Sequence, residues 1–396
     1  MTKKVLCILL AVSLLAVMAV GCSSDSSDSS TAPEATNEAA GDDAAATEDA
    51  GDDAAATDAA ADDTTTSNDA ADGVTDVAIL VPNADHGWTG AVMTYAEEAA
   101  KNINDAGQYT AQVITAADAS NQISQLEDLI ENKTAKSVVI LPHDNTLEAA
   151  MKRLQESGIP YVMFDRVIDS VSDGAVSNVK GDNEGIGKAT AQRFIEVDGL
   201  QPGENILIIP GDNSSVPEMR NNGFFEELKA NGWTDEQINA IASTAYTGWS
   251  RSEGKRLFTE WLDTLTPEQI AEWKYIFTHD DEIAMGILEA LKSSDINQEK
   301  KDAFLNAAVN LASSSGLNEI YTVLKNEHQK DYSEEVSKLG DLFTVTYDPA
   351  MIEIAVQDMV DYLNGQTVEQ DHVVAVDVVD ASNVNDYQGF GDAVAA

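Results

Sequence analysis

From Asp76 onward the sequence alternates short apolar runs with longer segments in which apolar residues recur every three or four positions. The run DVAILV precedes an amphipathic segment over residues 89–103, and later runs are TAQVITA, SVVIL, IPYVMF, NILIIP, AIASTAY, KYIFT and AFLNAAV. Each short run predicts a strand and each longer segment a helix, with Ser120, Asp182 and Ser250 beginning helices. Apolar strands separated by helices form parallel sheets covered on both faces. The alternation therefore predicts an α/β fold.

The length of the chain indicates that this α/β part is divided. A chain of 396 residues with 43% apolar residues can bury one large core or two ordinary ones, since domains usually run to about 100–200 residues. We therefore expect two lobes. In open parallel sheets the ligand lies beyond the carboxyl ends of the strands, so a binding site is expected there.

The N-terminal residues differ in composition from the rest. Residues 1–21 contain two early lysines, a mostly apolar run and a final glycine, which predicts a signal peptide. The site before Cys22 is similar to a bacterial lipoprotein processing site, where this cysteine is acylated; ordinary secretion with Cys22 incidental is the alternative. Residues 23–72 hold fifteen acidic residues, no Lys or Arg and no aromatic residue. Residues 22–72 thus predict a lipidated cysteine followed by a disordered acidic tether.

Charge and cysteine content exclude several classes of function. The net charge of −46 repels nucleic-acid phosphate and anionic lipid, and no basic patch offsets it. Cys7 lies inside the predicted signal, so cleavage leaves Cys22 as the single cysteine. An intramolecular disulfide and a cysteine-based metal site or nucleophile in the fold are therefore excluded.

Polar and aromatic side chains follow the predicted strands, at the edge where a ligand is expected. They are Asp85, His86, Trp88, Pro142, His143, Asp144, Asp165, Arg166, Trp249, Arg251, His279, Asp280, Asp281, Tyr347 and Asp348. Carboxylates and guanidinium groups form several hydrogen bonds with hydroxyls, and indole rings pack on the apolar face of a sugar ring. The set suits a neutral, hydroxyl-rich ring. A single tryptophan can equally be a core residue, and a single aspartate a helix N-cap.

Taken in order, several segments resemble the type I periplasmic sugar-binding proteins, the ribose and galactose binding family that serves ABC importers. FDRVID is similar to the family's Asp-Arg pair, SSVPEMRNNGF to the segment whose arginine reaches the sugar, and FTHDDEIAMGILEAL to its most recognisable stretch. The resemblance covers about residues 76–380. It implies a ligand site formed by His86, Trp88, Asp144, Asp165, Arg166, Arg220, Trp249, Asp280, Asn310 and Tyr347.

The resemblance also implies an organisation and a role. Two Rossmann-like lobes with parallel sheets are joined by a three-segment hinge: residues 73–181 and 349–374 form the first lobe, and residues 182–348 and 375–396 the second. The implied protein is a monomeric extracytoplasmic lipoprotein without catalysis or cofactor. It closes on a sugar or sugar-like polyol and delivers it to an ABC permease, and a chemoreceptor is a further partner that the resemblance allows.

The sequence departs from the family pattern at three places. After AFLNAAV, Asn310, Leu311 and Ala312 stand where many relatives have Gly-Phe-Asp, so an aspartate contact is absent. Residues 325–341 form a longer and more charged connector than usual, and His86 replaces a common asparagine. These departures leave the identity of the sugar open.

Other classes of site and protein fit the sequence less well. The segment GDNEGIGKAT lacks the glycine and the Ser or Thr that a phosphate-binding loop requires. His86, His143 and His279 each adjoin an aspartate, so a zinc site is an alternative. A hydrolase would need a nucleophile and a base, which the sequence does not offer, and a transcriptional regulator would need an N-terminal helix-turn-helix. A nucleoside or signalling molecule is the main alternative ligand, because indoles also stack on bases.

Overall fold

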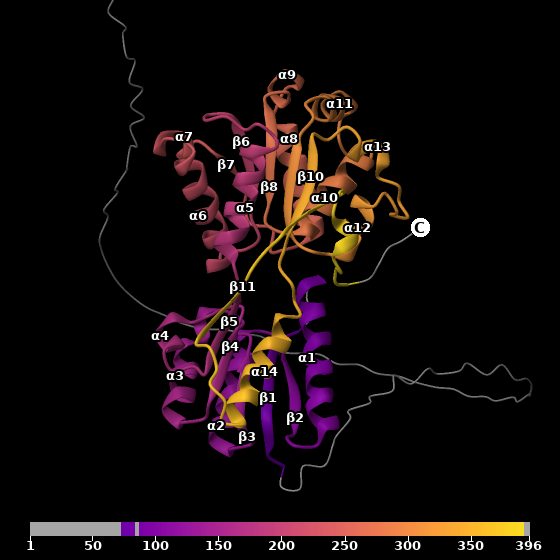
Figure 1. Ribbon diagram of the computed structural model, residues 1–396. Helices are drawn as coiled ribbons and strands as arrows, with labels where there is room; N and C mark the ends of the chain where they lie inside the picture. Colours follow the sequence, from indigo (N-terminus) through magenta and orange to yellow (C-terminus); the bar gives the residue numbers. More distant parts are fainter. Residues whose placement is uncertain (1–72, 84–86, 392–396) are drawn as a thin grey trace, which may run out of the picture. The chain divides into compact units, whose positions relative to one another are not determined.

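The computed structural model of the protein describes residues 73–83 and 87–391, and these belong to one compact unit of the chain (Figure 1). The predicted signal peptide, Cys22, the tether and His86 lie outside the described residues. In the described part, the strands form two six-stranded sheets.

The first sheet has the strand order β11-β5-β4-β3-β1-β2, and every neighbouring pair is parallel. Its strands are β1 (Thr75–Pro82), β2 (Ala111–Ala116), β3 (Ala135–Ile140), β4 (Tyr161–Phe164), β5 (Ser177–Gly181) and β11 (Asp371–Val374). The accompanying helices are α1 (Gly87–Ala106), α2 (Ala119–Asn132), η1 (Asn145–Leu147), α3 (Glu148–Ser157), α4 (Asp169–Ser172) and α14 (Met351–Leu363).

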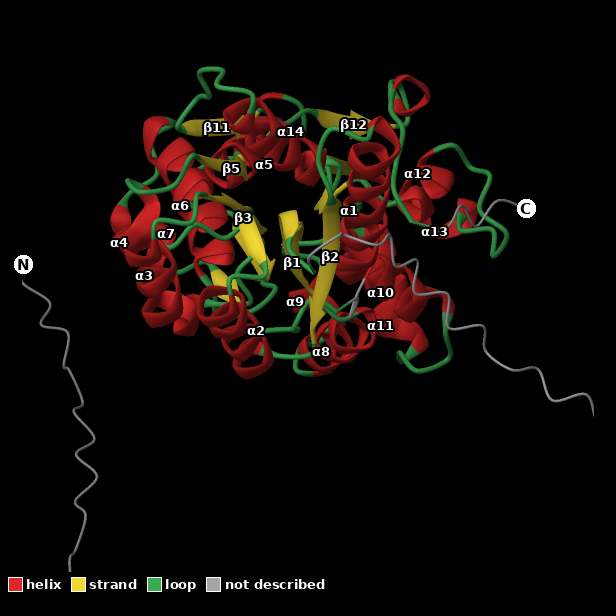
Figure 2. Ribbon diagram, turned by 90° about the horizontal axis from the view of Figure 1, so that it is seen from below, coloured by secondary structure: helices red, strands yellow, loops and turns green. Residues whose placement is uncertain are grey.

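Helices cover both faces of the first sheet because its strands are apolar on both sides. Alternate residues of β1 point to opposite faces. Val77 and Ile79 pack in one apolar cluster, which includes residues of α1 and α14, whereas Ala78 and Leu80 pack in a second cluster with residues of α2 and α3. Figure 2 shows α14 on one side of β1 and β3, and α2 on the other.

The second sheet has the order β12-β10-β9-β8-β6-β7, and only the β10–β12 pair is antiparallel among its described strands. Its strands are β6 (Asn205–Ile209), β7 (Ala242–Ser243), β8 (Trp273–Thr278), β9 (Asn310–Ser315), β10 (Asp341–Thr346) and β12 (Val378–Asp380). The helices that follow or precede them are α5 (Asn183–Glu196), α6 (Ser215–Ala230), α7 (Asp235–Asn239), α8 (Arg251–Asp263), α9 (Pro267–Ile270), α10 (Asp281–Lys292), α11 (Gln298–Asn306), α12 (Asn318–Leu324), α13 (Ser333–Val336) and η2 (Val384–Asp386).

The chain passes between the two sheets three times. It leaves the first sheet after β5, returns after β10 to form α14 and β11, and crosses again to β12. Two mostly parallel sheets flanked by helices confirm the predicted α/β fold class.

Two local predictions were wrong. The helix α2 begins after Asp118, whose carboxylate accepts from the Asn121 backbone N–H, and Ser120 lies inside the first turn. The run AFLNAAV is not a strand: its first four residues end α11, and the strand β9 begins only at Asn310. Phe304 and Leu305 are the buried residues of α11. The apolar residues of this run therefore form the buried face of a helix and not a strand.

Gly187 of GDNEGIGKAT and Gly223 of α6 allow α5 and α6 to cross closely. A Cβ atom at Gly187 would overlap the backbone carbonyl of Arg220, and one at Gly223 would overlap the carbonyl of Glu184. The helix α5 begins after Asp182, as predicted, because the Asp182 carboxylate accepts from the Gly185 backbone N–H. The segment therefore serves helix packing and places the first residue of α5 beside α6.

Candidate ligand-binding site

A small pocket lies at the carboxyl ends of strands from both sheets. Its lining comprises Trp88, Asp165, Arg166, Val216, Arg220, Trp249, Asp280, Ser315 and Tyr347. The structure thus brings together seven of the residues that the sequence singled out, and adds Val216 and Ser315.

Trp88 occupies the second position of α1 and is almost fully buried, with 7% of its surface exposed. Its ring stacks on Phe164, with 6.0 Å between ring centroids and 15° between the planes, and lies 5.6 Å from the ring of Tyr347. The indole N–H donates to the Tyr347 backbone carbonyl over 2.9 Å. Trp88 is therefore both a pocket wall and a core residue that connects the two sheets.

Trp249 precedes α8 and is partly exposed, with a positive φ of 62°. Its ring packs against Gly211, where a Cβ atom would overlap the indole. The Arg220 guanidinium lies over the indole, with Cζ 5.5 Å from the ring centroid. The ring is thus held by a glycine and a cation and does not belong to the apolar core of the described residues.

Tyr347 follows β10 and contacts residues of both sheets. Its hydroxyl donates to the Asp165 carboxylate and accepts from Asn183 Nδ2 over 3.1 Å. Its ring fits against Gly181, because a Cβ atom there would overlap it. The Tyr347 backbone N–H donates to the Ser315 carbonyl over 2.9 Å, so the end of β9 also holds this residue.

Arg220 extends from α6 and is 3% exposed. Its Nε donates to Asn183 Oδ1 over 3.0 Å, and its Nη1 donates to the His279 carbonyl and to Ser314 Oγ. Its Cζ lies 5.0 Å from the centroid of the Tyr347 ring. Burial lowers the pKa of Arg220, while nearby carboxylates act in the opposite direction. These contacts hold the guanidinium of Arg220 in place, and Arg220 lines the pocket.

Two buried carboxyl groups face the same pocket from different sheets. Asp165 follows β4 with a positive φ of 63°, and Arg166 Nε lies 3.9 Å from its Oδ2. Asp280 is the N-cap of α10, and its Oδ1 accepts from the Glu282 backbone N–H over 2.8 Å. Burial raises the pKa of Asp165, although Arg166 and the Tyr347 hydroxyl oppose this. Burial and the adjacent Asp281 raise the pKa of Asp280 well above its usual value.

Three of the predicted ligand residues are not among the pocket-lining residues. Asp144 instead caps η1, where its carboxylate accepts from the Thr146 backbone N–H over 2.8 Å. Asn310 is the first residue of β9, at the opposite edge of the sheet from the pocket, because the preceding run is helical. Neither residue lines the pocket in this structure, and a role of either in ligand binding stays a prediction. His86 lies outside the described residues.

The residues that sequence reasoning missed became recognisable only from the strand boundaries. Ser315 is the true exit residue of β9, and its φ of 142° is one that non-glycine residues rarely adopt. Val216 lies in the first turn of α6, inside the segment SSVPEMRNNGF that was singled out for Arg220. The signal for Ser315 was the serine run of NLASSS, which apolar periodicity alone does not identify as a strand.

Of the three histidines considered for zinc, His143 and His279 lie in the described part of the chain, where other side chains are their neighbours. His279 is fully buried on Phe277, and its Nε2 lies 3.1 Å from Asn221 Oδ1. Burial and the nearby Arg220 lower the pKa of His279 well below its usual value. His143 Nδ1 lies 3.8 Å from Asp144 Oδ2. Within residues 73–83 and 87–391, no group of three or more His, Cys, Asp or Glu side chains is arranged to hold a metal ion.

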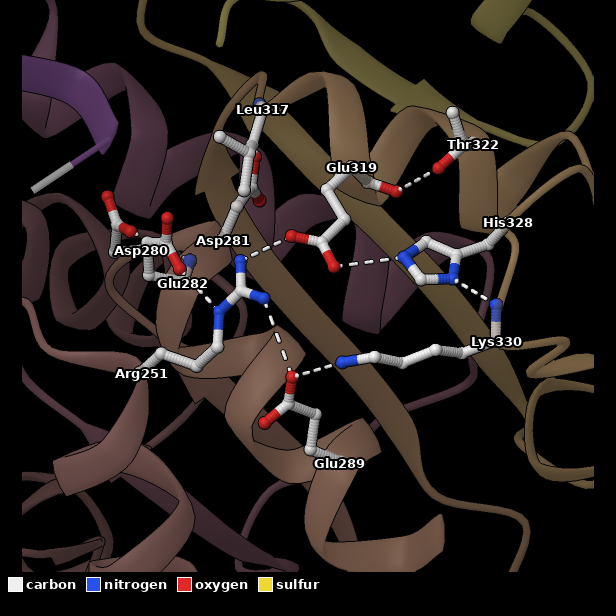
Figure 3. A network of polar contacts seen from close by, with 10 residues as sticks. All are labelled: Arg251, Asp280, Asp281, Glu282, Glu289, Leu317, Glu319, Thr322, His328 and Lys330. Carbon is white, nitrogen blue, oxygen red and sulfur yellow. Dashed lines mark hydrogen bonds and ion pairs between the residues drawn. The ribbon is translucent and has the colours of Figure 1, made fainter. Parts of the chain in front are cut away.

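Arg251, another strand-exit residue, belongs to a network behind the pocket (Figure 3). Its guanidinium pairs with Glu282 at 2.6 Å, Glu319 at 2.5 Å and Glu289 at 3.5 Å. His328 Nε2 lies 2.9 Å from Glu319 Oε1, which ties the charged 325–341 connector to α12. Asp281 is also fixed, because it accepts from Ser313, Thr344 and the backbone of residues 316–317. These groups support α10, which carries Asp280.

Two mostly parallel sheets connected by three segments, with a polar and aromatic pocket at the strand ends, are typical of a binding protein that encloses its ligand. The model of the periplasmic binding protein domain matches residues 77–367, and the chain belongs to this family. The predicted resemblance is thereby confirmed at the level of the family. The family consists of substrate-binding proteins rather than enzymes, and membership implies an extracytoplasmic location.

Two curated relatives share part of this sequence. The ribose import binding protein of Bacillus subtilis (strain 168) is 27% identical over 179 residues, which are 45% of this chain and 53% of that protein. The fructose import binding protein of Bifidobacterium longum (strain NCC 2705) is 22% identical over 274 residues, which are 68% of this chain and 74% of that protein. The chain thus spans about half the length of the first relative.

Solved structures share the fold over most of the chain. A galactofuranose binding protein has a TM-score of 0.62 at 20% identity, covering 79% of this chain and 96% of that one. A solute binding protein from Bacillus halodurans C-125 with bound myo-inositol has a TM-score of 0.61 at 22% identity, covering 80% and 98%. In the part of the chain that the structure describes, none of the helices combines the length and apolarity that a membrane span requires.

Proposed function

We propose that the protein is the substrate-binding lipoprotein of an ABC importer and that it binds a neutral monosaccharide or polyol in the pocket. The observation that carries this proposal is the convergence of two carboxyl groups, a buried guanidinium and two indoles on one small cavity. Its relatives include proteins named for ribose and fructose import, and a solved structure of the same fold holds myo-inositol.

The chemistry of the pocket matches a ring with many hydroxyls. A hydroxyl donates to a carboxylate and accepts from a guanidinium, so Asp165, Asp280 and Arg220 can together bind several positions of one ring. Trp88 and Trp249 supply apolar surface for its C–H groups.

Binding is coupled to closure because the pocket draws on both sheets. Asp165 and Trp88 follow strands of the first sheet, β4 and β1, whereas Arg220, Trp249 and Asp280 lie in segments that follow strands of the second sheet. A ligand that contacts both sets stabilises only the arrangement in which they meet, and so shifts a conformational equilibrium. In this proposal the three connecting segments form the hinge, and the permease recognises the closed form.

The experiment that tests the ligand class is calorimetry on the chain processed to begin at residue 22, with Cys22→Ser to prevent acylation. The ligands are D-ribose, D-fructose, D-allose, myo-inositol, adenosine and Zn²⁺. We expect one or more of the sugars or the polyol to bind, and Asp280→Asn and Arg220→Lys to weaken that binding by about 2 kcal/mol or more each.

Asp128→Asn is the matched control, because Asp128 is exposed on α2 and does not line the pocket, so its loss should leave affinity unchanged. Binding of adenosine alone would replace the sugar proposal by the nucleoside alternative, and binding of Zn²⁺ alone would replace it by a metal function. A chain that binds nothing in this panel contradicts the proposed ligand class.

The proposed anchor is the acyl group on Cys22, supported by the preceding apolar run and the acidic segment that follows. Two or more acyl chains suffice for stable membrane anchoring. Labelled fatty acid should enter the wild-type chain and be absent from Cys22→Ser. Equal labelling of both chains would leave ordinary secretion as the remaining interpretation.

A further inference from the structure

Asn183 is a buried amide that stands between two groups of the pocket without lining the pocket itself. It is the first residue of α5 and is 3% exposed. Arg220 Nε donates to its Oδ1 over 3.0 Å, and its Nδ2 donates to the Tyr347 hydroxyl over 3.1 Å. The close crossing of α5 and α6 at Gly187 and Gly223 sets the distance between this amide and Arg220.

Arg220 determines which group donates and which accepts in each hydrogen bond of this series. A guanidinium can only donate, so the amide oxygen must face Arg220 and the amide nitrogen must face Tyr347. The Tyr347 hydroxyl then accepts from Asn183 and uses its own proton to donate to Asp165. One ordered chain of hydrogen bonds thus runs from α6, over α5 and the end of β10, to the end of β4 in the first sheet.

This order determines which atoms remain for a ligand. Arg220 uses Nε for Asn183 and Nη1 for His279 and Ser314, which leaves Nη2 as its donor among the described contacts. Tyr347 occupies Oδ1 of Asp165, while Arg166 Nε lies 3.9 Å from Oδ2. Oδ2 is therefore the oxygen of Asp165 that can accept from a ligand hydroxyl.

We propose that Asn183 is a positioning residue, which orients Arg220, Tyr347 and Asp165 so that the pocket selects a ligand offering a hydroxyl donor to Asp165 and an acceptor oxygen to Arg220. It acts through these three side chains and does not touch the ligand. The inference rests on the proposed function, since it concerns the same pocket.

Asn183→Asp tests this role because the variant keeps the shape of the side chain. When the introduced carboxyl group is ionised, it accepts from both Arg220 and Tyr347, which draws the Tyr347 proton away from Asp165. The charged and titratable groups that face position 183 are Arg220 from α6, Tyr347 from the end of β10 and Asp165 from the end of β4, and Asp182 and Glu184 are its chain neighbours.

The measurement is the dissociation constant for D-ribose, with D-fructose and myo-inositol in parallel. We expect Asn183→Asp to bind at least about tenfold more weakly than the wild type, which is about 1.4 kcal/mol. Asn222→Asp, at an exposed position of α6, is the control and should bind as the wild type does. A dissociation constant for Asn183→Asp equal to that of the wild type overturns the proposal.

A second measurement needs no sugar and so separates this inference from the proposed function. If the wild type binds none of the three compounds, the proposed ligand class fails, but Asn183 can still be tested in sugar-free crystals. In Asn183→Leu, which removes both hydrogen bonds at similar volume, we expect the Tyr347 hydroxyl to leave Asp165 and the guanidinium of Arg220 to rotate. Unchanged positions of both side chains overturn the positioning role.

Discussion

Trp88 and Trp249 line the same pocket, but the two side chains are held in different ways. Trp88 is buried in the apolar core, stacks on Phe164 and donates to the Tyr347 carbonyl. Trp249 is partly exposed and rests on Gly211 and Arg220. Trp88 therefore packs in the core in addition to lining the pocket, whereas Trp249 lines the pocket without belonging to the core of the described residues.

We predict that Trp88→Ala lowers both stability and affinity, whereas Trp249→Ala lowers chiefly affinity. Loss of the buried ring of Trp88 should reduce the free energy of unfolding by about 2–4 kcal/mol. Each truncation should weaken sugar binding by about 2–4 kcal/mol, the range for aromatic anchors. Denaturant unfolding and calorimetry on the same samples measure the two effects.

Trp233 provides the control, because it is 5% exposed in the core and does not line the pocket. Trp233→Ala should reduce stability and leave the dissociation constant of the folded protein unchanged. An unchanged dissociation constant for Trp249→Ala would exclude its indole as a wall of the binding site.

At the scale of elements, the crossing of α5 and α6 sets the geometry that places Asn183 beside Arg220. Gly223→Ala would bring a methyl group against the Glu184 carbonyl, so the helices must separate. We expect a loss of about 1–3 kcal/mol in stability, as in other overpacked sites, together with weaker sugar binding. Thermal unfolding and calorimetry check both effects, and Asn222→Ala at the preceding, exposed position should change neither. Wild-type stability and affinity in Gly223→Ala would contradict the close-crossing argument.

Elements with a clear apolar period could be predicted from sequence, and those without one could not. The run DVAILV lies entirely within β1, because its residues are buried on both faces of a parallel sheet. The strand β9 reads NLASSS, and its serines are buried by hydrogen bonds: Ser313 donates to Asp281, and Ser314 to the His279 carbonyl. Apolar content does not identify such a strand, and it wrongly predicts a strand at the neighbouring run AFLNAAV, which ends α11.

The candidate site was predictable where a residue type both marks a strand exit and suits the chemistry, as at Asp165 and Tyr347. Asp144 has the same sequence context, but its carboxylate satisfies a helix terminus instead. Sequence cannot separate these two uses of an aspartate, because both occur at the start of a helix after a strand. Asn183 was missed since its role depends on a tertiary crossing that no local pattern encodes.

For the whole molecule, the pocket and the amino-terminal edge of the second sheet have separate electrostatic environments. The pocket lies at the carboxyl ends of the strands, whereas Asp198 lies near Asp341 at the start of β10. Burial and the Asp341 carboxylate raise the pKa of Asp198 to about 7, and Arg193 opposes this shift. Stability and binding can therefore be perturbed independently of each other.

We predict that Asp198→Asn stabilises the protein at pH 8 but not at pH 4. A carboxyl group whose pKa is raised on folding, here from 3.8 to about 7, favours the folded state below pH 3.8. This contribution is lost progressively as the pH rises through the folded value, because the ionised group must then be kept beside Asp341. A fully buried group with this shift would change the free energy of unfolding by about 4 kcal/mol, but solvent screens the half-buried Asp198, so we expect about 1 kcal/mol.

The measurement is urea unfolding of Asp198→Asn and wild type between pH 4 and pH 8, with Asp128→Asn, at an exposed position of α2, as the control for loss of a charge. The stability difference for Asp198→Asn should grow between pH 5 and pH 7 while affinity for a sugar stays unchanged, and a difference independent of pH would show that Asp198 keeps its ordinary pKa in the folded protein.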